Sequence, residues 1–257
     1  MLTRYQLILE PDRPCAIGPE WGYRLYAALL SQTPEGFGAA LHQNAVTPLS
    51  QFVWAEKTGA LHWTVSLLGE ISEEILSPLL EGVPSLYLER DRVELRVTAI
   101  RSDWVHDVDE LFARAARQEG RHALRFQTPT AFKSRGQYVN LPTTRLLMQS
   151  LVQKWNGSFL DCPIEDEDGL GVETLAAGLR WRGFQLRDQS YRLKGSAIPG
   201  FNGAAVDHQV SAVAGSKTIV IGDDLTGFSG AVVFNGQGSG RALRFNNGIV
   251  IVKFCGN

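Results

Sequence analysis

The sequence of 257 residues contains few cysteines and histidines and lacks a long hydrophobic segment. Its three cysteines lie far apart and form no CxxC pair, which argues against a disulfide framework and a cysteine-based zinc site. The five histidines show no metal-ligand spacing, so we expect no metal and no other cofactor. No apolar run approaches the roughly 18 residues of a membrane-spanning helix, and Gln6 and Glu10 interrupt the N-terminus too early for a signal peptide. These absences predict a cytoplasmic protein that contacts no membrane.

The sequence also lacks an excess of charge of either sign. It has 25 lysines and arginines against 27 aspartates and glutamates, which gives a formal net charge of −2. A nearly neutral chain does not attract a polyanion through its overall field. A nucleic-acid-binding surface on this protein would therefore have to be a local basic face.

The first part of the sequence alternates between strand-like and helix-like segments. Residues 3–10 alternate polar and apolar side chains, which is typical of a strand. Further strands are predicted at 51–56, 61–68 and 87–100, and helices at 20–31, at 34–42 and from Ser72 onwards. The order is β-α-β-β-α-β, the ferredoxin-like unit, so we expect a four-stranded antiparallel sheet with its helices on one face.

The second part of the sequence starts in the same way, after a helix predicted at 106–118. The predicted elements are a strand at 123–127, a hairpin at 133–139 around Gly136, a helix capped by Thr143, an acidic loop at 163–171, and strands at 179–186 and 191–198. Beyond Gly200 the sequence is rich in glycine and β-formers, without a helical pattern. The expected fold class is α+β, with two tandem ferredoxin-like (RRM-like) domains, residues 1–119 and 120–257, built on antiparallel sheets.

Several motifs in this order resemble one known family. Segments 126–134 (FQTPTAFKS) and 146–156 (LLMQSLVQKWN) combine a Thr-Pro-Thr turn, a basic hairpin and an amphipathic helix that ends in Trp-Asn. Leu41 and His42 close the first helical region, and the remaining motifs are HWTVSLLGE at 62–70 and Gly-Phe-x-Gly at 200–203 and 227–230. The ordered set is similar to that of the CRISPR-associated endoribonucleases of the RAMP superfamily, which process precursor guide RNA. The resemblance covers roughly residues 1–203.

The resemblance implies metal-independent cleavage of RNA, in which the ribose 2′-hydroxyl attacks the adjacent phosphorus and leaves a 2′,3′-cyclic phosphate and a 5′-hydroxyl. His42 matches the motif histidine and is implied as the general base, since an unperturbed imidazole accepts a proton near neutral pH. Tyr26, one helix earlier, is expected to orient the scissile phosphate as a neutral donor. The alternative for His42 is a solvated residue at a helix end without a catalytic role. The alternative for Tyr26 is a residue of the apolar face of its helix. No basic residue occurs at 43–50, so the sequence does not identify the group that stabilises the transition-state charge.

Basic residues in the second part are candidates for RNA binding. Lys133 and Arg135 lie at the tip of the predicted hairpin, where we expect them to contact phosphates. Arg192 and Lys194 belong to a series of basic residues along the later strands. For this series, a track for phosphates and the solvated side of an antiparallel sheet are both open interpretations.

The end of the sequence departs from the family pattern. The family has a helix followed by a glycine-rich loop that approaches RNA, and Gly236, Gly238 and Gly240 are the matching glycines here, without the preceding helix. The leading hypothesis is an endoribonuclease that cleaves CRISPR repeat RNA (precursor crRNA) to produce guide RNAs. The alternative is a non-catalytic RNA-binding subunit of a CRISPR effector complex, whose other subunits would then be further partners.

Overall fold

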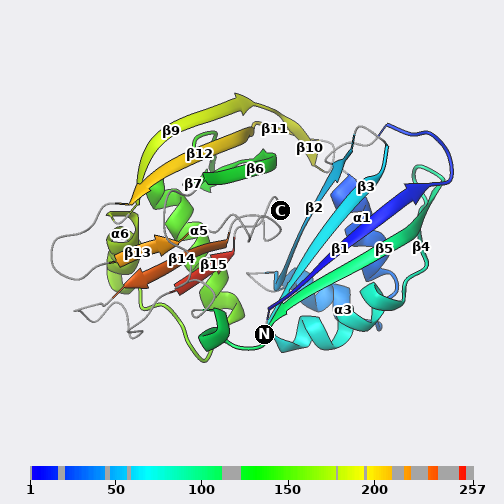
Figure 1. Cartoon of the computed structure of the whole chain (residues 1–257), viewed down its shortest axis with the longest axis horizontal. Helices are drawn as coiled ribbons and strands as arrows, with labels where there is room; N and C mark the ends of the chain where they lie inside the picture. Colours follow the sequence, from blue (N-terminus) through cyan, green and yellow to red (C-terminus); the bar gives the residue numbers. More distant parts are fainter. Residues whose placement is uncertain are drawn as a thin grey trace.

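The computed structural model combines β-sheets with helices in both parts of the chain, and Figure 1 shows the first part on the right and the second part on the left. The described residues are 2–16, 21–43, 47–56, 59–111, 123–177, 179–193, 196–209, 217–220, 231–236 and 249–252. Within these ranges, no helix is long and apolar enough to cross a membrane.

The first part forms a five-stranded antiparallel sheet in the order β2-β3-β1-β5-β4. Strand β1 (Leu2–Pro11) lies at its centre, between β3 (Leu61–Leu68) and β5 (Val93–Val105). The edge strands are β2 (Leu49–Ala55) and β4 (Ser85–Leu88). The four strands β2-β3-β1-β5 have the predicted ferredoxin-like arrangement.

The fifth strand corrects the prediction of a single strand at 87–100. The structure divides this region into β4 and β5, which pair as an antiparallel hairpin. A tight turn joins them: the backbone N–H of Asp91 donates to the Leu88 carbonyl at 3.1 Å, and Arg92 has a positive φ of 53°. The apolar alternation continues on both sides of this charged turn, so the sequence pattern did not reveal the reversal of the chain.

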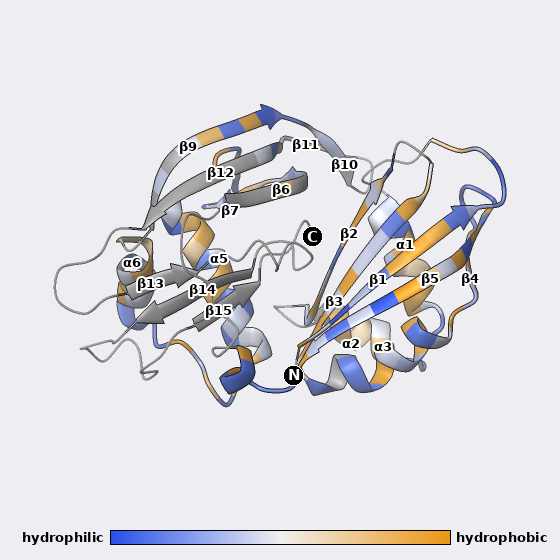
Figure 2. Ribbon diagram, in the orientation of Figure 1, coloured by the Kyte–Doolittle hydropathy of each residue, from blue (hydrophilic) through white to orange (hydrophobic). Residues whose placement is uncertain are grey.

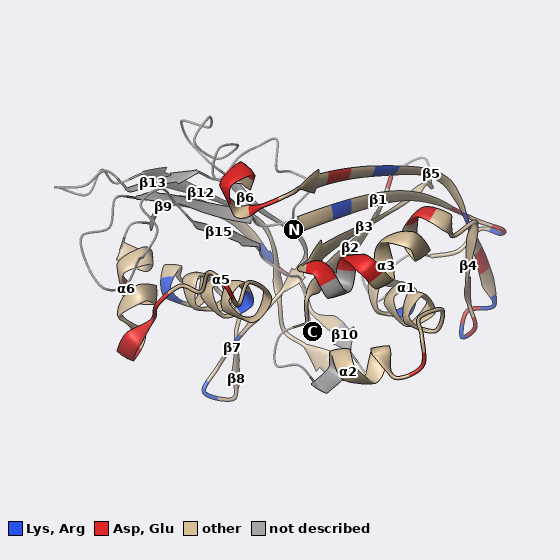
Figure 3. Cartoon of the chain, turned by 90° about the horizontal axis from the view of Figure 1, so that it is seen from below, with Lys and Arg blue, Asp and Glu red and all other residues tan. Residues whose placement is uncertain are grey.

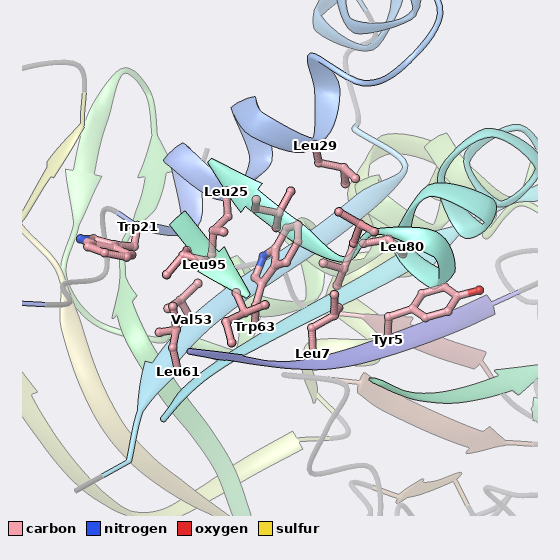
Figure 4. Packing of buried hydrophobic residues seen from close by; sticks show 14 of the residues in the cluster. Tyr5, Leu7, Trp21, Leu25, Leu29, Val53, Leu61, Trp63, Leu80 and Leu95 are labelled. Atoms are coloured by element: carbon pink, nitrogen blue, oxygen red, sulfur yellow. The ribbon is translucent and has the colours of Figure 1, made fainter. Parts of the chain in front are cut away.

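Three helices cover one face of this sheet, as predicted. They are α1 (Trp21–Leu30), α2 (Phe37–Gln43) and α3 (Glu70–Gly82), and Figure 3 shows them together on one side of β1, β3 and β5. Their buried leucines pack against alternate residues of the strands, among them Leu7 and Trp63, as Figure 4 shows. Every second side chain of β1 thus packs in the core, while the side chains between them point to the opposite face of the sheet.

The second part is built on a three-stranded antiparallel sheet in the order β6-β12-β9. Its strands are β6 (Ala123–Thr130), β12 (Phe201–Gln209) and β9 (Leu179–Asp188), and Figure 2 shows hydrophilic and hydrophobic residues alternating along β9. Helices α5 (Thr144–Ser158) and α6 (Leu170–Ala177) pack beside this sheet. The predicted strands at 123–127 and 179–186 and the helix after Thr143 are therefore confirmed.

Two predictions in the second part are wrong in detail. Residues 191–198 form a hairpin of β10 (Tyr191–Leu193) and β11 (Ser196–Ile198) rather than one strand. The acidic loop contains a 3-10 turn, η1 (Glu167–Gly169), and leads directly into α6. Helix α6 is only eight residues long and weakly amphipathic, so it left no clear helical pattern.

The glycine-rich C-terminal region contributes further strands rather than a helix within the described ranges. These are β13 (Lys217–Val220), β14 (Ala231–Gly236) and β15 (Ile249–Val252), which form a three-stranded antiparallel sheet.

The two parts share one hydrophobic cluster. Leu2, Leu68 and Val105 of the first sheet lie in the same cluster as residues of the second part such as Trp155 and Phe201. Because a packed interior resists relative displacement of its elements, this cluster fixes the second part against one end of the first sheet. The proposed boundary between residues 119 and 120 lies outside the described residues and stays a prediction.

Candidate active site and nucleic-acid interface

Helix α1 positions Tyr26 over the first core. Trp21, Leu25 and Leu29 are buried on one side of the helix, and the half-buried Tyr26 packs against the same cluster. Burial, and to a lesser extent the neighbouring Tyr23, raises the pKa of the Tyr26 hydroxyl. A phenol with a raised pKa stays protonated near neutral pH, so Tyr26 is suited to donate a hydrogen bond and not to act as a base.

Helix α2 carries His42 near its C-terminal end. The preceding residue, Leu41, is buried in the first core, so α2 is anchored on the same sheet face as α1. The backbone of His42 lies in α2, whereas its side chain lies outside the described part of the molecule. The structure thus places the two predicted catalytic residues on helices that share one face of the sheet.

The predicted basic hairpin is confirmed as β7 (Phe132–Ser134) and β8 (Gln137–Val139). Its two-residue turn has positive φ at Arg135 (49°) and at Gly136 (80°), which fits the strand twist of a tight hairpin. Lys133 and Arg135 are both exposed, and Lys133 Nζ lies 5.9 Å from the ring centroid of Tyr138. Figure 3 shows this hairpin projecting on the same side of the molecule as α2.

The other predicted RNA-binding residues are less completely described. Arg192 lies in β10, where only its backbone is described, and Gly236 is the last residue of β14, paired with Lys217. Lys194, Gly238 and Gly240 lie outside the described residues. Their assignment to RNA binding stays a prediction.

The Trp-Asn pair that ends α5 has a structural role. Trp155 Nε1 donates to the Cys162 carbonyl at 2.7 Å. The Asn156 side chain donates to the Ile164 carbonyl at 2.9 Å and accepts from the Ile164 N–H at 2.7 Å. These bonds satisfy the backbone of the loop after α5 and hold it against the helix.

The first Gly-Phe-x-Gly motif also has a structural role. Phe201 is buried against Phe126, with ring centroids 4.8 Å apart. A Cβ atom on Gly203, whose φ is 129°, would lie 2.0 Å from the Gln185 carbonyl oxygen. Only glycine fits this close approach of β12 to β9. The second copy of the motif, at 227–230, lies outside the described residues.

One basic residue of α5 has an environment that the sequence did not indicate. Lys154 is half-buried, and desolvation lowers the pKa of its ammonium group to about 8. This burial comes from tertiary packing, which helical spacing alone does not specify. Within the described ranges, no group of three or more histidine, cysteine, aspartate or glutamate residues is placed to hold a metal ion.

Comparison with known proteins relates this chain to one protein family. Residues 124–256 match the family model of the CRISPR-associated endoribonuclease Cas6. Cas6 of Mycobacterium tuberculosis is 29% identical over 263 residues, covering 98% of this chain and 78% of the relative. Cas6 of Streptococcus thermophilus is 26% identical over 181 residues, covering 70% of this chain and 73% of the relative.

Solved structures show the same fold. A Cas6 product complex is similar with a TM-score of 0.63 and 23% identity, covering 82% of this chain and 85% of that chain. Thermus thermophilus Cas6 has a TM-score of 0.59 and 22% identity, covering 83% and 85%. The fold class, α+β with tandem ferredoxin-like domains, is therefore confirmed.

The family model covers more than half of the chain. The chain therefore belongs to the Cas6 family of CRISPR-associated endoribonucleases. The motifs predicted this membership, and the predicted enzyme class, an endoribonuclease, is confirmed.

The environment of Lys154 predicts how stability depends on pH. Its pKa is about 8 in the folded protein against 10.5 for an ordinary lysine. Between these values the unfolded chain binds more protons, so the free energy of unfolding should rise by about 2–3 kcal/mol from pH 8 to pH 10.5 through this residue. Urea denaturation at several pH values measures this rise. Lys154→Met should remove that part of the rise, whereas Gln153→Met should retain it; equal pH profiles for the two variants would contradict the assignment.

Proposed function

We propose that this protein cleaves CRISPR repeat RNA to release guide RNAs, without a metal ion, by attack of the ribose 2′-hydroxyl. The observation that carries the proposal is the placement of Tyr26 on α1 and His42 on α2, two helices anchored on one sheet face. The similar solved structures include Cas6 in a product complex and in a substrate mimic complex, which supports repeat RNA as the ligand.

The chemistry requires proton removal and charge stabilisation but no covalent bond to the protein. His42 accepts the proton of the 2′-hydroxyl as its oxygen bonds to phosphorus and the bond from phosphorus to the 5′-oxygen breaks. The leaving 5′-oxygen takes up a proton, which gives a 5′-hydroxyl and a 2′,3′-cyclic phosphate. Tyr26, held in the protonated form by burial, donates a hydrogen bond to the scissile phosphate.

Binding of the RNA involves the β7–β8 hairpin. Lys133 and Arg135 are exposed cations on the side of the molecule that carries α2, so they are suited to contact phosphates near the cleavage site. Arg192, Lys194 and the glycines at 236, 238 and 240 are further proposed contacts, on the strength of the sequence pattern.

A non-catalytic RNA-binding subunit of an effector complex is the second candidate. The observation that favours it is the C-terminal region, where the structure has β14 and β15 in a sheet and the family pattern has a helix before the glycine-rich loop. Binding of repeat RNA without cleavage would identify this function.

The catalytic assignment predicts the behaviour of His42→Ala. Loss of a general base should lower the cleavage rate of repeat RNA by about 10²–10⁴-fold. The fold and the RNA affinity should be nearly unchanged, because a side chain at a helix end contributes little to packing. Single-turnover cleavage and a filter-binding titration measure the two quantities separately.

His106→Ala is the matched control for this prediction. His106 is an exposed histidine just before another helix, so its removal should leave cleavage unchanged. Cleavage by His42→Ala at the wild-type rate would remove His42 from the mechanism.

The hairpin assignment predicts weaker and less salt-dependent binding for Lys133→Glu/Arg135→Glu. Each lost phosphate contact should flatten the slope of log K against log salt by about 0.7, because fewer counterions are released from single-stranded RNA. Arg90→Glu/Arg92→Glu reverses two exposed arginines in the β4–β5 turn and should leave the slope unchanged. If the two double variants bind alike, Lys133 and Arg135 are only solvated surface residues.

A further inference from the structure

Gln51 of β2 joins the first sheet to α1 through its side-chain amide. Its Oε1 accepts a hydrogen bond from Trp63 Nε1 at 2.7 Å, and its Nε2 donates to the Gly22 carbonyl oxygen at 2.6 Å. Gln51 and Trp63 lie on adjacent strands, and Trp63 is buried in the core beneath the helices (Figure 4). The amide therefore connects a buried indole to the backbone of a helix.

The two partners of Gln51 have opposite hydrogen-bonding characters. An indole N–H only donates and a carbonyl oxygen only accepts, so the side chain between them needs one acceptor and one donor at its end. An ionised glutamate offers acceptors only, and a methionine of similar length has no donor. Glutamine supplies both groups, and its two contacts determine which way its amide is turned.

The carbonyl that Gln51 contacts belongs to the helical turn that carries Tyr26. In an α-helix the carbonyl oxygen of residue 22 accepts the backbone N–H of residue 26, so Gln51 Nε2 and the Tyr26 N–H meet at one oxygen. The spacing of four residues also places Tyr26 on the same side of α1 as Gly22. A movement of the Gln51 amide is therefore transmitted directly to the backbone of this turn.

Arg24 ties the other flank of α1 to the opposite edge of the sheet. With 3.6 residues per turn, Arg24 lies about 200° around the helix from Gly22. Its guanidinium pairs with the Asp91 carboxylate in the β4–β5 turn, and both side chains are only 22% exposed. Because β2 and β4 are the two edge strands, the bonds at Gly22 and Arg24 together resist rotation of α1 about its own axis.

Apolar packing alone defines this rotation less well. Trp21, Leu25 and Leu29 supply the buried surface of α1, but hydrophobic burial has no preferred direction. A hydrogen bond, in contrast, weakens steeply when its donor and acceptor are misaligned. The Tyr26 hydroxyl lies at the end of a long side chain, so a small rotation of the helix moves it further than it moves the helix axis.

We propose that Gln51 is a positioning residue for RNA cleavage: its amide fixes the rotation of α1 so that the Tyr26 hydroxyl meets the scissile phosphate. The proposal rests on the proposed function, because it acts through the hydrogen bond that Tyr26 donates there. Gln51 itself touches no reacting atom, so its effect is expected in the rate of cleavage and not in the affinity for RNA.

The test is single-turnover cleavage of repeat RNA by Gln51→Glu, beside a filter-binding titration with the 2′-deoxy substrate. The introduced carboxylate still accepts from Trp63 but has no donor for the Gly22 carbonyl. The cleavage rate should fall about 10- to 100-fold, since misplacement by about 1 Å has an effect of this size, and the affinity should be nearly unchanged. Gln51→Met is a second variant, which lacks the donor without adding a charge and should show the same separation of rate from affinity.

A double-mutant cycle with Tyr26→Phe separates positioning from a general loss of stability. Once the Tyr26 hydroxyl is absent, Gln51→Glu should lower the cleavage rate little further, because no hydroxyl is left to misplace. Gln149→Glu is the matched control: it makes the same chemical change on α5, beside Arg145, which donates to Gln149 Oε1 at 3.4 Å. This control should cleave at the wild-type rate.

Two results would overturn the proposal. One is cleavage at the wild-type rate by both Gln51 variants. The other is an equal fold-loss from Gln51→Glu with and without the Tyr26 hydroxyl, because Gln51 would then support the fold in general and not the position of Tyr26.

Failure of this proposal is distinguishable from failure of the proposed function. If Tyr26→Phe cleaves slowly while both Gln51 variants cleave normally, the role of Tyr26 remains and only the positioning role of Gln51 is wrong. If the wild type binds repeat RNA without cleaving it, the proposed function fails and the role of Gln51 in cleavage fails with it.

Discussion

The indole of Trp63 lies within the first core, and its hydrogen bond begins a chain that ties three elements together. Nε1 of Trp63 donates to Gln51 Oε1 at 2.7 Å, and Gln51 Nε2 donates to the Gly22 carbonyl oxygen at 2.6 Å. A buried indole nitrogen without a partner is costly, so α1 cannot slide along the sheet without losing this chain of bonds. Tyr26 lies one helical turn beyond Gly22, and its position over the core depends on this arrangement.

The same strand alternation that builds the core also creates the second face of the sheet. Alternate side chains of each strand pack under α1, α2 and α3, and the intervening side chains lie on the opposite face, among them Leu2, Leu68 and Val105. The cluster shared by both parts of the chain fixes the second part against one end of the sheet. The β7–β8 hairpin and α2 are thereby held on one side of the molecule.

Much of the fold followed from the sequence where a local pattern determined it. The alternation of residues 3–10, the cap at Thr143 and the turn at Gly136 predicted β1, α5 and the β7–β8 hairpin. The prediction failed where a turn was hidden within continuing alternation, as at Asp91, and at the short helix α6. Site geometry was less accessible: the close approach of β12 to β9 at Gly203 depends on the pairing of two distant strands, and the shifted pKa of Lys154 depends on tertiary packing. Neither is encoded in local spacing.

The central claim is that the RNA supplies the nucleophile and the protein supplies acid–base catalysis without a metal ion. The most direct measurement is cleavage of the cognate repeat RNA in excess EDTA, with mapping of both product ends and a parallel substrate that carries a 2′-deoxy group at the scissile nucleotide. The account predicts undiminished cleavage in EDTA, a 2′,3′-cyclic phosphate and a 5′-hydroxyl, and an intact 2′-deoxy substrate that still binds. Dependence on a divalent cation, or cleavage of the 2′-deoxy substrate, would contradict it.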